Sequence, residues 1–180
     1  MFVQTEVTPN PNALKFIPGR AVSNNGSFEV TKKEDSNNDL VRSLLSINGV
    51  TGIFLGSDFL SVNKEQDKKW EDIKHIVISL INEHYSDGKK FVVDKNDKEQ
   101  NNSDFAEIEQ KIIKILDTKI RPAVAKDGGD IKFKEFKNGV VKVELQGSCS
   151  GCPSSTMTLK QGVQNLLCHY LPEVKEVVAI

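Results

Sequence analysis

Residues 138–163 read NGVVKVELQGSCSGCPSSTMTLKQGV and carry, in order, the signals of a tight turn, a strand, a cysteine loop and a helix. The opening Asn-Gly is the dipeptide that a two-residue hairpin turn prefers. Apolar residues alternate over 140–145, as on the buried face of a strand. Pro153 suits the first turn of a helix, where its missing N–H needs no partner. We therefore expect the cysteines between the end of a strand and the start of a helix.

Cys149 and Cys152 form the C-x-x-C of this loop. Two thiols are half of the four that a thiolate metal site or an iron–sulfur cluster normally takes. We expect the N-terminal end of the following helix to stabilise their thiolates. Gly147 and Gly151 would let the backbone wrap closely around an inorganic centre. The pattern predicts a metal or redox site whose remaining ligands come from elsewhere.

The other cysteine and the histidines do not complete this site. Cys168 lies 16 residues beyond Cys152 on the same predicted helix, so the two stand about 20 Å or more apart. His169 is too far from Cys152 to be a ligand for the same reason. Cys168 is expected on the helix surface, and His75 and His84 on a solvated helix face. The missing ligands would then come from a second chain on a two-fold axis, from small thiols or from a partner protein.

Composition limits the class of protein. The net charge is -1 and Lys and Arg are spread evenly, whereas a nucleic-acid partner would favour a basic stripe. No run of about 18 apolar residues predicts a membrane span. Three cysteines favour reduced thiols in a cytosol-like compartment. The first residues, MFVQTEVTPNPNALKF, show neither a secretory nor a transit signal, so we expect a folded domain from the start.

The run DKNDKEQNNS (94–103) has no apolar side chain and predicts a polar linker. It separates an N-terminal domain, 1–93, from a C-terminal domain, 104–180. We expect an α+β or α/β fold in which each domain is a short β-sheet packed with two helices.

Local patterns predict the elements of each domain. In the N-terminal domain they indicate strands at 14–17, 28–30, 52–55 and 59–62 and helices at 39–47 and 70–85. In the C-terminal domain they indicate a helix at 104–120 closed by Arg121-Pro122, strands at 131–137 and 140–145, a helix at 153–171 and a last strand at 174–180.

The turn DGGD (127–130) has two interpretations. Turn chemistry around its two glycines accounts for Asp127 and Asp130. Alternatively, their carboxylates bond to loop amides or to a client protein. For the N-terminal domain we expect a stabilising or partner-docking module.

Several motifs resemble a known family. The C-terminal half resembles the NifU-like C-terminal domain through RPAVAKDGGDI (121–131), GSCSGCPSSTMTLKQGV (147–163) and HYLPEV (169–174). The N-terminal half resembles the preceding domain of Nfu-type proteins through TEVTPNPNALKF (5–16), INGVTGIFLGSDFLSVNK (47–64) and the helix at 70–85.

The resemblance implies an iron–sulfur cluster scaffold or carrier, not an enzyme. Such a protein would hold a [4Fe-4S] cluster, or alternatively a [2Fe-2S] cluster, between two subunits of a homodimer. It would receive the cluster from upstream donors and deliver it to apo iron–sulfur proteins, lipoate-synthesising and respiratory enzymes among them. Cys149 and Cys152 match the cluster ligands. The missing transit signal favours a bacterial cytoplasmic protein, or a mature protein of the mitochondrial matrix.

Three other readings remain. A thioredoxin-like enzyme uses the same strand, C-x-x-C and helix order, but only 28 residues follow Cys152, too few for its further strands. The cysteine pair could instead be half of a structural zinc site shared across a dimer. In the third reading the thiols are inert and the chain is an interaction module.

Overall fold

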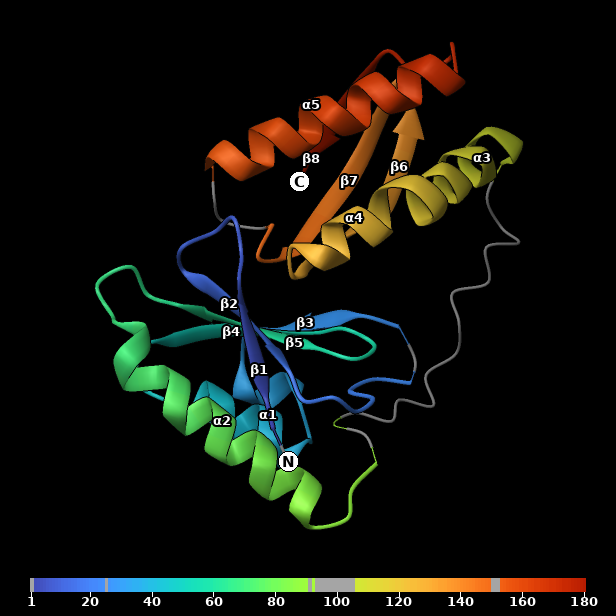
Figure 1. Cartoon of the computed structure of the whole chain (residues 1–180). Helices are drawn as coiled ribbons and strands as arrows, with labels where there is room; N and C mark the ends of the chain where they lie inside the picture. The colour runs from blue at the N-terminus through green and yellow to red at the C-terminus, as the bar shows by residue number, and fades with distance from the viewer. Residues whose placement is uncertain (1, 25, 91, 93–105, 150–152) are drawn as a thin grey trace.

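The computed structural model describes residues 2–24, 26–90, 92, 106–149 and 153–180 of the 180-residue chain (Figure 1). The predicted linker at 94–103 lies outside these residues, and so does Cys152. The described part forms two units, each a β-sheet with helices packed on it. This confirms the predicted α+β class.

The N-terminal domain holds a five-stranded antiparallel sheet in the order β1-β2-β5-β4-β3. Its elements are β1 (Gln4–Val7), β2 (Ala13–Ile17), β3 (Phe28–Val30), the 3-10 turn η1 (Lys33–Asp35), α1 (Asp39–Leu45), β4 (Val50–Leu55), β5 (Leu60–Lys64) and α2 (Trp70–Ser86). The helices α1 and α2 cover one face of the sheet (Figure 1). Strand β1 and the 3-10 turn η1 are the elements of this domain that sequence patterns did not indicate.

Period-two alternation builds the core of this domain. Val62 of β5 pairs with Leu14 of β2 and with Ile53 of β4, and all three point toward the helices. Helix α2 adds Ile73 and Val77 at helical spacing. The N-terminal core is therefore a sheet face closed by two amphipathic helices.

The C-terminal domain holds a three-stranded sheet in the order β6-β7-β8. Its elements are α3 (Glu107–Ile115), the π-helix η3 (Leu116–Ile120), α4 (Arg121–Lys126), β6 (Gly129–Lys137), β7 (Val140–Gly147), α5 (Pro153–Tyr170) and β8 (Glu176–Ala179). Strands β6 and β7 form a hairpin, and β8 joins β7 in parallel. The predicted hairpin turn is confirmed, since Asn138 and Gly139 both have positive φ, 52° and 79°.

The predicted helix at 104–120 is not one regular helix. The π-helix η3 follows α3, and α4 then continues the same rod. The expectation that Pro122 ends the helix is therefore wrong. Pro122 stands in the first turn of α4, where the wider π turn before it has already interrupted the regular bonding pattern that a proline ring would block.

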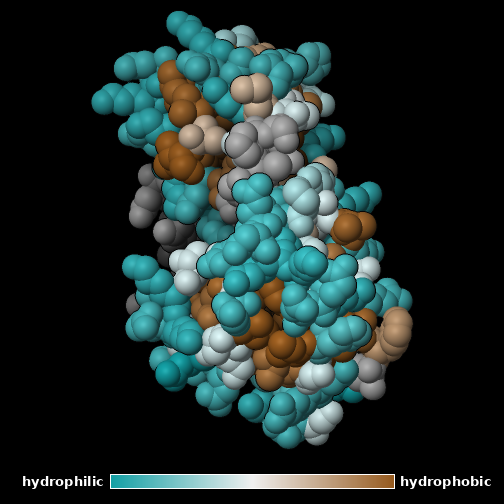
Figure 2. All heavy atoms as spheres, turned by 90° about the vertical axis from the view of Figure 1, so that its left-hand side faces the viewer, coloured by the Kyte–Doolittle hydropathy of each residue, from teal (hydrophilic) through white to brown (hydrophobic). Residues whose placement is uncertain are grey.

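Two large apolar residues of the predicted helices do not reach a core. Ile76 of α2 and Tyr170 of α5 are exposed, although each follows buried apolar residues at helical spacing. Seen from the left-hand side of Figure 1, hydrophobic side chains lie in separate patches on the two domains, in keeping with two separate cores (Figure 2). Within the described residues, no helix is both long and apolar enough to cross a membrane.

The two domains contact each other through the second face of the N-terminal sheet. In Figure 1 this sheet lies between its own helices and the C-terminal domain. The opposing elements on the other side are α4, the start of β6 and the end of β7, which is the end of the C-terminal domain that carries the cysteine loop.

Candidate functional site

Cys149 lies just beyond the end of β7 and before α5, at the predicted strand-to-helix junction. Its side chain is only 7% exposed and belongs to the C-terminal core. The hydroxyl of Thr156, in the first turns of α5, donates a 3.1 Å hydrogen bond to the Cys149 carbonyl. The cysteine backbone is thus tied to the helix that follows it.

Gly129 lies directly against the Cys149 sulfur. A β-carbon at position 129 would stand 2.7 Å from Sγ of Cys149 and 2.6 Å from the carbonyl oxygen of Gln146. Contacts this short do not occur for real side chains, so only glycine fits there. The DGGD turn therefore leaves space for the cysteine by having no side chain at this point.

Ser148 connects the cysteine loop to the DGGD turn. Its hydroxyl donates to the carbonyl of Asp127, and its N–H donates to the carbonyl of Gly128 at 3.3 Å. Gly147, just before it, has φ of 69°, which a residue with a side chain rarely adopts. The two loops form one unit around Cys149.

Asp130 does more than close a turn. Its carboxylate accepts two hydrogen bonds of 2.9 Å from Arg121, at Nε and Nη2, and one of 2.8 Å from the N–H of Ile131. Arg121 also donates to Asp117 at 3.0 Å. The hydrogen bonds that Arg121 donates to Asp130 raise the pKa of Arg121 above its already high ordinary value. Turn chemistry alone, the simpler interpretation of Asp130, is thus incomplete.

The environment of Cys149 disfavours its thiolate. Burial raises the pKa of the thiol to about 11, the hydrogen bond with Ser148 opposes this, and the charges of Asp127 and Asp130 add to it. The expectation of a helix-stabilised thiolate is wrong for Cys149 in this conformation. Burial of the side chain raises the pKa most, and the charges of two carboxylates act in the same direction.

The predicted partner of Cys149 lies outside the described residues, so the pairing of Cys149 with Cys152 stays a prediction. Cys149 and Cys168 are both free thiols. The surface interpretation of Cys168 is wrong in part, because its side chain is half-buried and its thiol donates to the carbonyl of Val174 at 3.2 Å.

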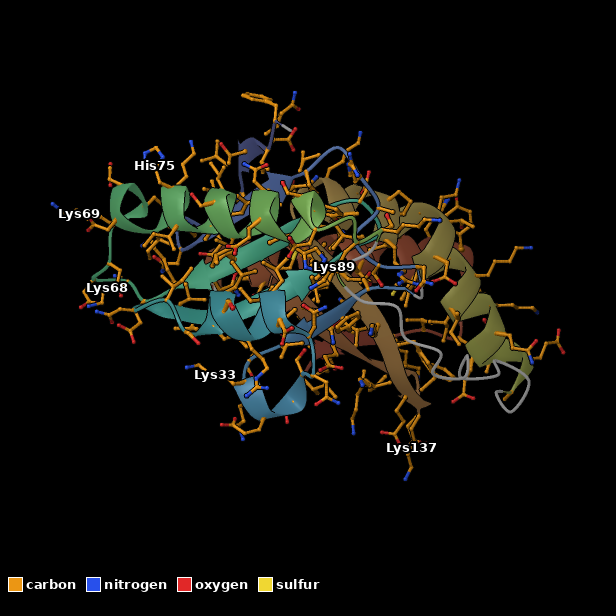
Figure 3. The ribbon with its side chains drawn as sticks, turned by 90° about the horizontal axis from the view of Figure 1, so that it is seen from below. Lys33, Lys68, Lys69, His75, Lys89 and Lys137 are labelled. Carbon is orange, nitrogen blue, oxygen red and sulfur yellow. The ribbon has the colours of Figure 1, made fainter. Side chains whose placement is uncertain are left out.

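The three histidines differ in their exposure to solvent. His75 projects outward from α2, as expected (Figure 3), and His169 is also exposed. The surface interpretation of His84 is wrong, because its ring is buried and packs edge-on against Tyr85 with centroids 5.3 Å apart. Among the described residues, no group of three or more His, Cys, Asp or Glu could hold a metal ion.

Sequence reasoning missed the N-terminal side chains that contact the two loops. The hydroxyl of Ser61 donates to the Gly128 carbonyl at 2.7 Å, and Asn63 donates to the Gly147 carbonyl at 3.4 Å. The Glu29 carboxylate accepts a hydrogen bond from the N–H of Gly147. The pKa of Glu29 is raised, mainly by burial and also by the charge of Glu144, while the bond from Gly147 opposes the shift. The only signal was the Leu-Ser-Val-Asn alternation of β5, which is also typical of a solvent-facing strand.

The chain is similar to known proteins over almost its whole length. Residues 3–88 match the family described as scaffold protein Nfu/NifU N terminal, and residues 112–178 match the NifU-like domain. It is 40% identical over 184 residues to NifU-like protein 4, mitochondrial, of Arabidopsis thaliana, and 41% identical over 180 residues to NFU1 iron-sulfur cluster scaffold homolog, mitochondrial, of Homo sapiens.

Each of these alignments covers 98% of this chain, which spans 65% of the length of the plant protein and 71% of the human one. Among solved structures, the solution NMR structure of a NifU-like protein from Saccharomyces cerevisiae is 27% identical, with a TM-score of 0.47 over 52% of this chain and 84% of that one.

Proposed function

Because the chain belongs to the Nfu family of NifU-like proteins, we propose that it is a non-catalytic carrier of iron–sulfur clusters. Its cargo is a labile [4Fe-4S] cluster, held by Cys149 and Cys152 of each of two chains and handed on to apo iron–sulfur proteins. The observation that carries this proposal is the position of Cys149, at a strand-to-helix junction and against the bare backbone of Gly129.

The chemistry of the donor set supports iron–sulfur cargo. Thiolates are the usual ligands of iron–sulfur clusters, and a cubane cluster takes four of them. One C-x-x-C supplies two, and the described residues add no third ligand nearby. Two chains related by a two-fold axis complete the set with identical loops.

Incomplete ligation in each chain suits a carrier better than an electron-transfer protein. A cluster that bridges two subunits is released when the subunits part, whereas a cluster wrapped by one chain is not. The client proteins would be apo iron–sulfur proteins, and an upstream assembly system would be the donor. Both relatives are named as mitochondrial proteins; the cytoplasm or the mitochondrial matrix would keep the thiols reduced.

The burial of Cys149 bears on how a cluster is loaded. In the described conformation its side chain is only 7% exposed, and burial raises the pKa of its thiol to about 11. Binding iron removes the proton, as thiolate ligation always does. We propose that the Cys149 side chain becomes more exposed when two chains take up the cluster.

The test is anaerobic reconstitution with iron and sulfide, followed by iron and sulfide analysis and by measurement of the mass in solution. We expect a brown protein with about four irons per two chains and a shift from monomer to dimer. Cys149→Ala and Cys152→Ala should bind no cluster. Cys168→Ser is the matched control and should bind as much iron as the wild type.

Transfer separates a carrier from a store. The loaded protein is mixed with an apo iron–sulfur enzyme, and recovery of that enzyme's activity is followed over time. Full cluster binding without any transfer would contradict the carrier function. A colourless protein with stoichiometric zinc that is lost in Cys149→Ala would assign the pair to a structural zinc site instead.

A further inference from the structure

One row of side chains crosses all five strands of the N-terminal sheet on the face away from its helices. Strand register places them side by side in the order Glu6, Lys15, Ser61, Phe54 and Glu29. We call these five residues the docking row. On β2, β5, β4 and β3 their neighbours along the strand point to the opposite face and pack in or against the N-terminal core.

Four members of the docking row contact the C-terminal domain. Lys15 donates from Nζ to the carbonyls that end α4, at 3.3 Å for Ala125 and 3.5 Å for Lys126. Beside it, Ser61 bonds to the carbonyl of the DGGD turn. Phe54 packs against Gly147, where a β-carbon would stand 2.9 Å from the ring.

The fourth contact is the hydrogen bond that Glu29 accepts from the Gly147 N–H. Within the N-terminal domain, Lys15 has two further contacts. The Lys15 ammonium lies 4.5 Å from the centre of the Phe59 ring and 3.5 Å from a carboxylate oxygen of Glu6. These contacts hold Lys15 in place for the α4 carbonyls, where a positive charge favours the negative end of a helix.

Two aromatic residues show that this face is built to be covered. Phe54 is 1% exposed and Phe59 is 5% exposed, yet neither belongs to the hydrophobic core of either domain. Phe54, on the face of the sheet away from α1 and α2, packs against Gly147 of the C-terminal domain, and the Phe59 ring, 5.9 Å from that of Phe54 between centroids, faces the same cleft between the domains. Large apolar side chains on a solvent-facing sheet would be costly to leave bare.

The covered surface of the C-terminal domain is the one around the cysteine. The docking row contacts the carbonyls of Ala125 and Lys126 at the end of α4, the carbonyl of Gly128 in the DGGD turn, and Gly147 at the end of β7, all next to Cys149 or to the turn that contacts it. Ser27, next to the row, adds a hydrogen bond to Asp130, and Lys132 donates to the Ser27 carbonyl at 2.9 Å.

The contact is also separable. Most of the contacts between the domains are hydrogen bonds. A cleft of about 300 Å³ remains between the domains, lined by Phe54 and Phe59 on one side and by Arg121 and Pro122 on the other. An interface of this kind between domains permits relative motion. Fourteen residue steps join Val92 to Ala106, and that length of chain can span up to about 50 Å.

We propose that the docking row is the intramolecular binding surface for the cysteine-loop end of the C-terminal domain, and that the docked chain is a closed form which must open before two chains can share a cluster. The second half rests on the proposed function. Ligands of one cluster converge on a centre only a few ångströms across. In the closed form Cys149 has the C-terminal core on one side, and the N-terminal sheet holds the loops on another.

Phe54→Ser tests the docking, because it removes the central apolar contact and leaves the N-terminal core intact. Phe2→Ser is the matched control, since Phe2 is 80% exposed. In the apo protein, hydrogen exchange of the Gly147 amide should speed up by about tenfold or more in Phe54→Ser, and small-angle scattering should show a larger radius of gyration. Phe2→Ser should change neither.

Circular dichroism and thermal unfolding establish that each variant folds. Should Phe54→Ser fail to fold, Lys15→Gln takes its place, because it removes the ammonium that donates to the α4 carbonyls, together with its contacts to Glu6 and Phe59 inside the N-terminal domain. Unchanged exchange and scattering in the folded variant would overturn the docking. A concentration-dependent apo dimer in the wild type would assign the surface to a second chain and overturn the intramolecular form.

The gating half is tested by the rate of anaerobic cluster uptake. The open variant should load about threefold faster or more than the wild type, with the same final iron content. An open variant that loads at the wild-type rate would overturn the gating and leave the docking standing. A wild type that binds no cluster under any condition would overturn the proposed function, while exchange and scattering would still decide the docking.

Discussion

The hydroxyl of Ser61 donates a buried 2.7 Å hydrogen bond to the carbonyl of Gly128, 67 residues further along the chain. This bond joins the middle strand of the N-terminal sheet to the turn that makes room for Cys149. It links the two domains at the point where the proposed chemistry takes place.

Ser61→Ala should lower the free energy of unfolding by about 0.5–1.5 kcal/mol, because the Gly128 carbonyl loses its buried hydroxyl donor and keeps only the 3.3 Å bond from the Ser148 N–H. Chemical denaturation followed by circular dichroism measures the loss. Ser79→Ala is the control, since Ser79 is exposed on α2, and its effect should stay within about 0.5 kcal/mol. Equal effects in the two variants would mean that the interdomain bond carries no net stability.

Asp130→Asn should destabilise the C-terminal domain by about 2 kcal/mol. The Asp130 side chain is 6% exposed and its partner Arg121 is 37% exposed, so the cost of an unpaired guanidinium is smaller than for a fully buried pair. Asp117→Asn removes a carboxylate from the same arginine at a more exposed position and should cost about 0.5 kcal/mol or less. Thermal unfolding of both variants gives the comparison. The reverse order would contradict the role of Asp130 as the main partner.

Gly129→Ala should disturb the cysteine loop and lower stability. Its new methyl group would meet both the Cys149 sulfur and the Gln146 carbonyl at under 3 Å, and such overpacking typically costs about 1–3 kcal/mol. Cluster uptake should fall with it.

Gly162→Ala is the control for Gly129→Ala and should have the opposite effect on stability. Gly162 lies in α5 and has open space where a β-carbon would go. Because alanine is the better helix former, this variant should be more stable by about 0.5–1 kcal/mol and should load normally. Destabilisation of both variants would show that the contact with Cys149 is not the cause.

The phenol of Tyr85 should lose its proton at a higher pH than an ordinary tyrosine. Burial raises its pKa to about 12, against a smaller opposite effect of Arg20, and its hydroxyl donates to the Ala21 carbonyl at 2.7 Å. The folded state thus keeps this proton above the ordinary tyrosine pKa of about 10. Its contribution to stability is complete below pH 10 and is lost as the pH rises toward 12.

The measurement is phenolate absorbance in Tyr170→Phe, which leaves Tyr85 as the single tyrosine. The midpoint should lie near 12, provided that the fold survives to that pH. Titration near 10 in a folded protein would contradict the burial. Tyr85→Phe should remove the corresponding part of the pH dependence of unfolding.

Local chemistry predicted the parts of the fold that depend on neighbouring residues. Asn138-Gly139 makes the hairpin turn, and α5 begins at Pro153, as their backbone preferences require. The position of Cys149 at the strand-to-helix junction followed from these two signals.

Local sequence signals could not predict contacts between residues that are far apart in the chain. The polar residues Ser61 and Asn63 alternate with apolar ones as on any solvent-facing strand, yet a second domain covers them. Likewise, Pro122 would end a regular helix, but the π turn before it allows the helix to continue. The raised pKa of Cys149 arises from burial and from carboxylates brought there by folding, which spacing along the chain does not encode.

The contact between the docking row and the C-terminal domain joins two parts of one chain, so the affinity it needs is lower than for separate proteins. Two sites joined in one chain meet at an effective concentration on the order of millimolar, so a contact too weak to hold separate proteins together can still be largely occupied. The isolated domains, mixed at micromolar concentration, would then show no binding. A competitor would have to bind the row or the cysteine loop far more tightly than the domains bind each other.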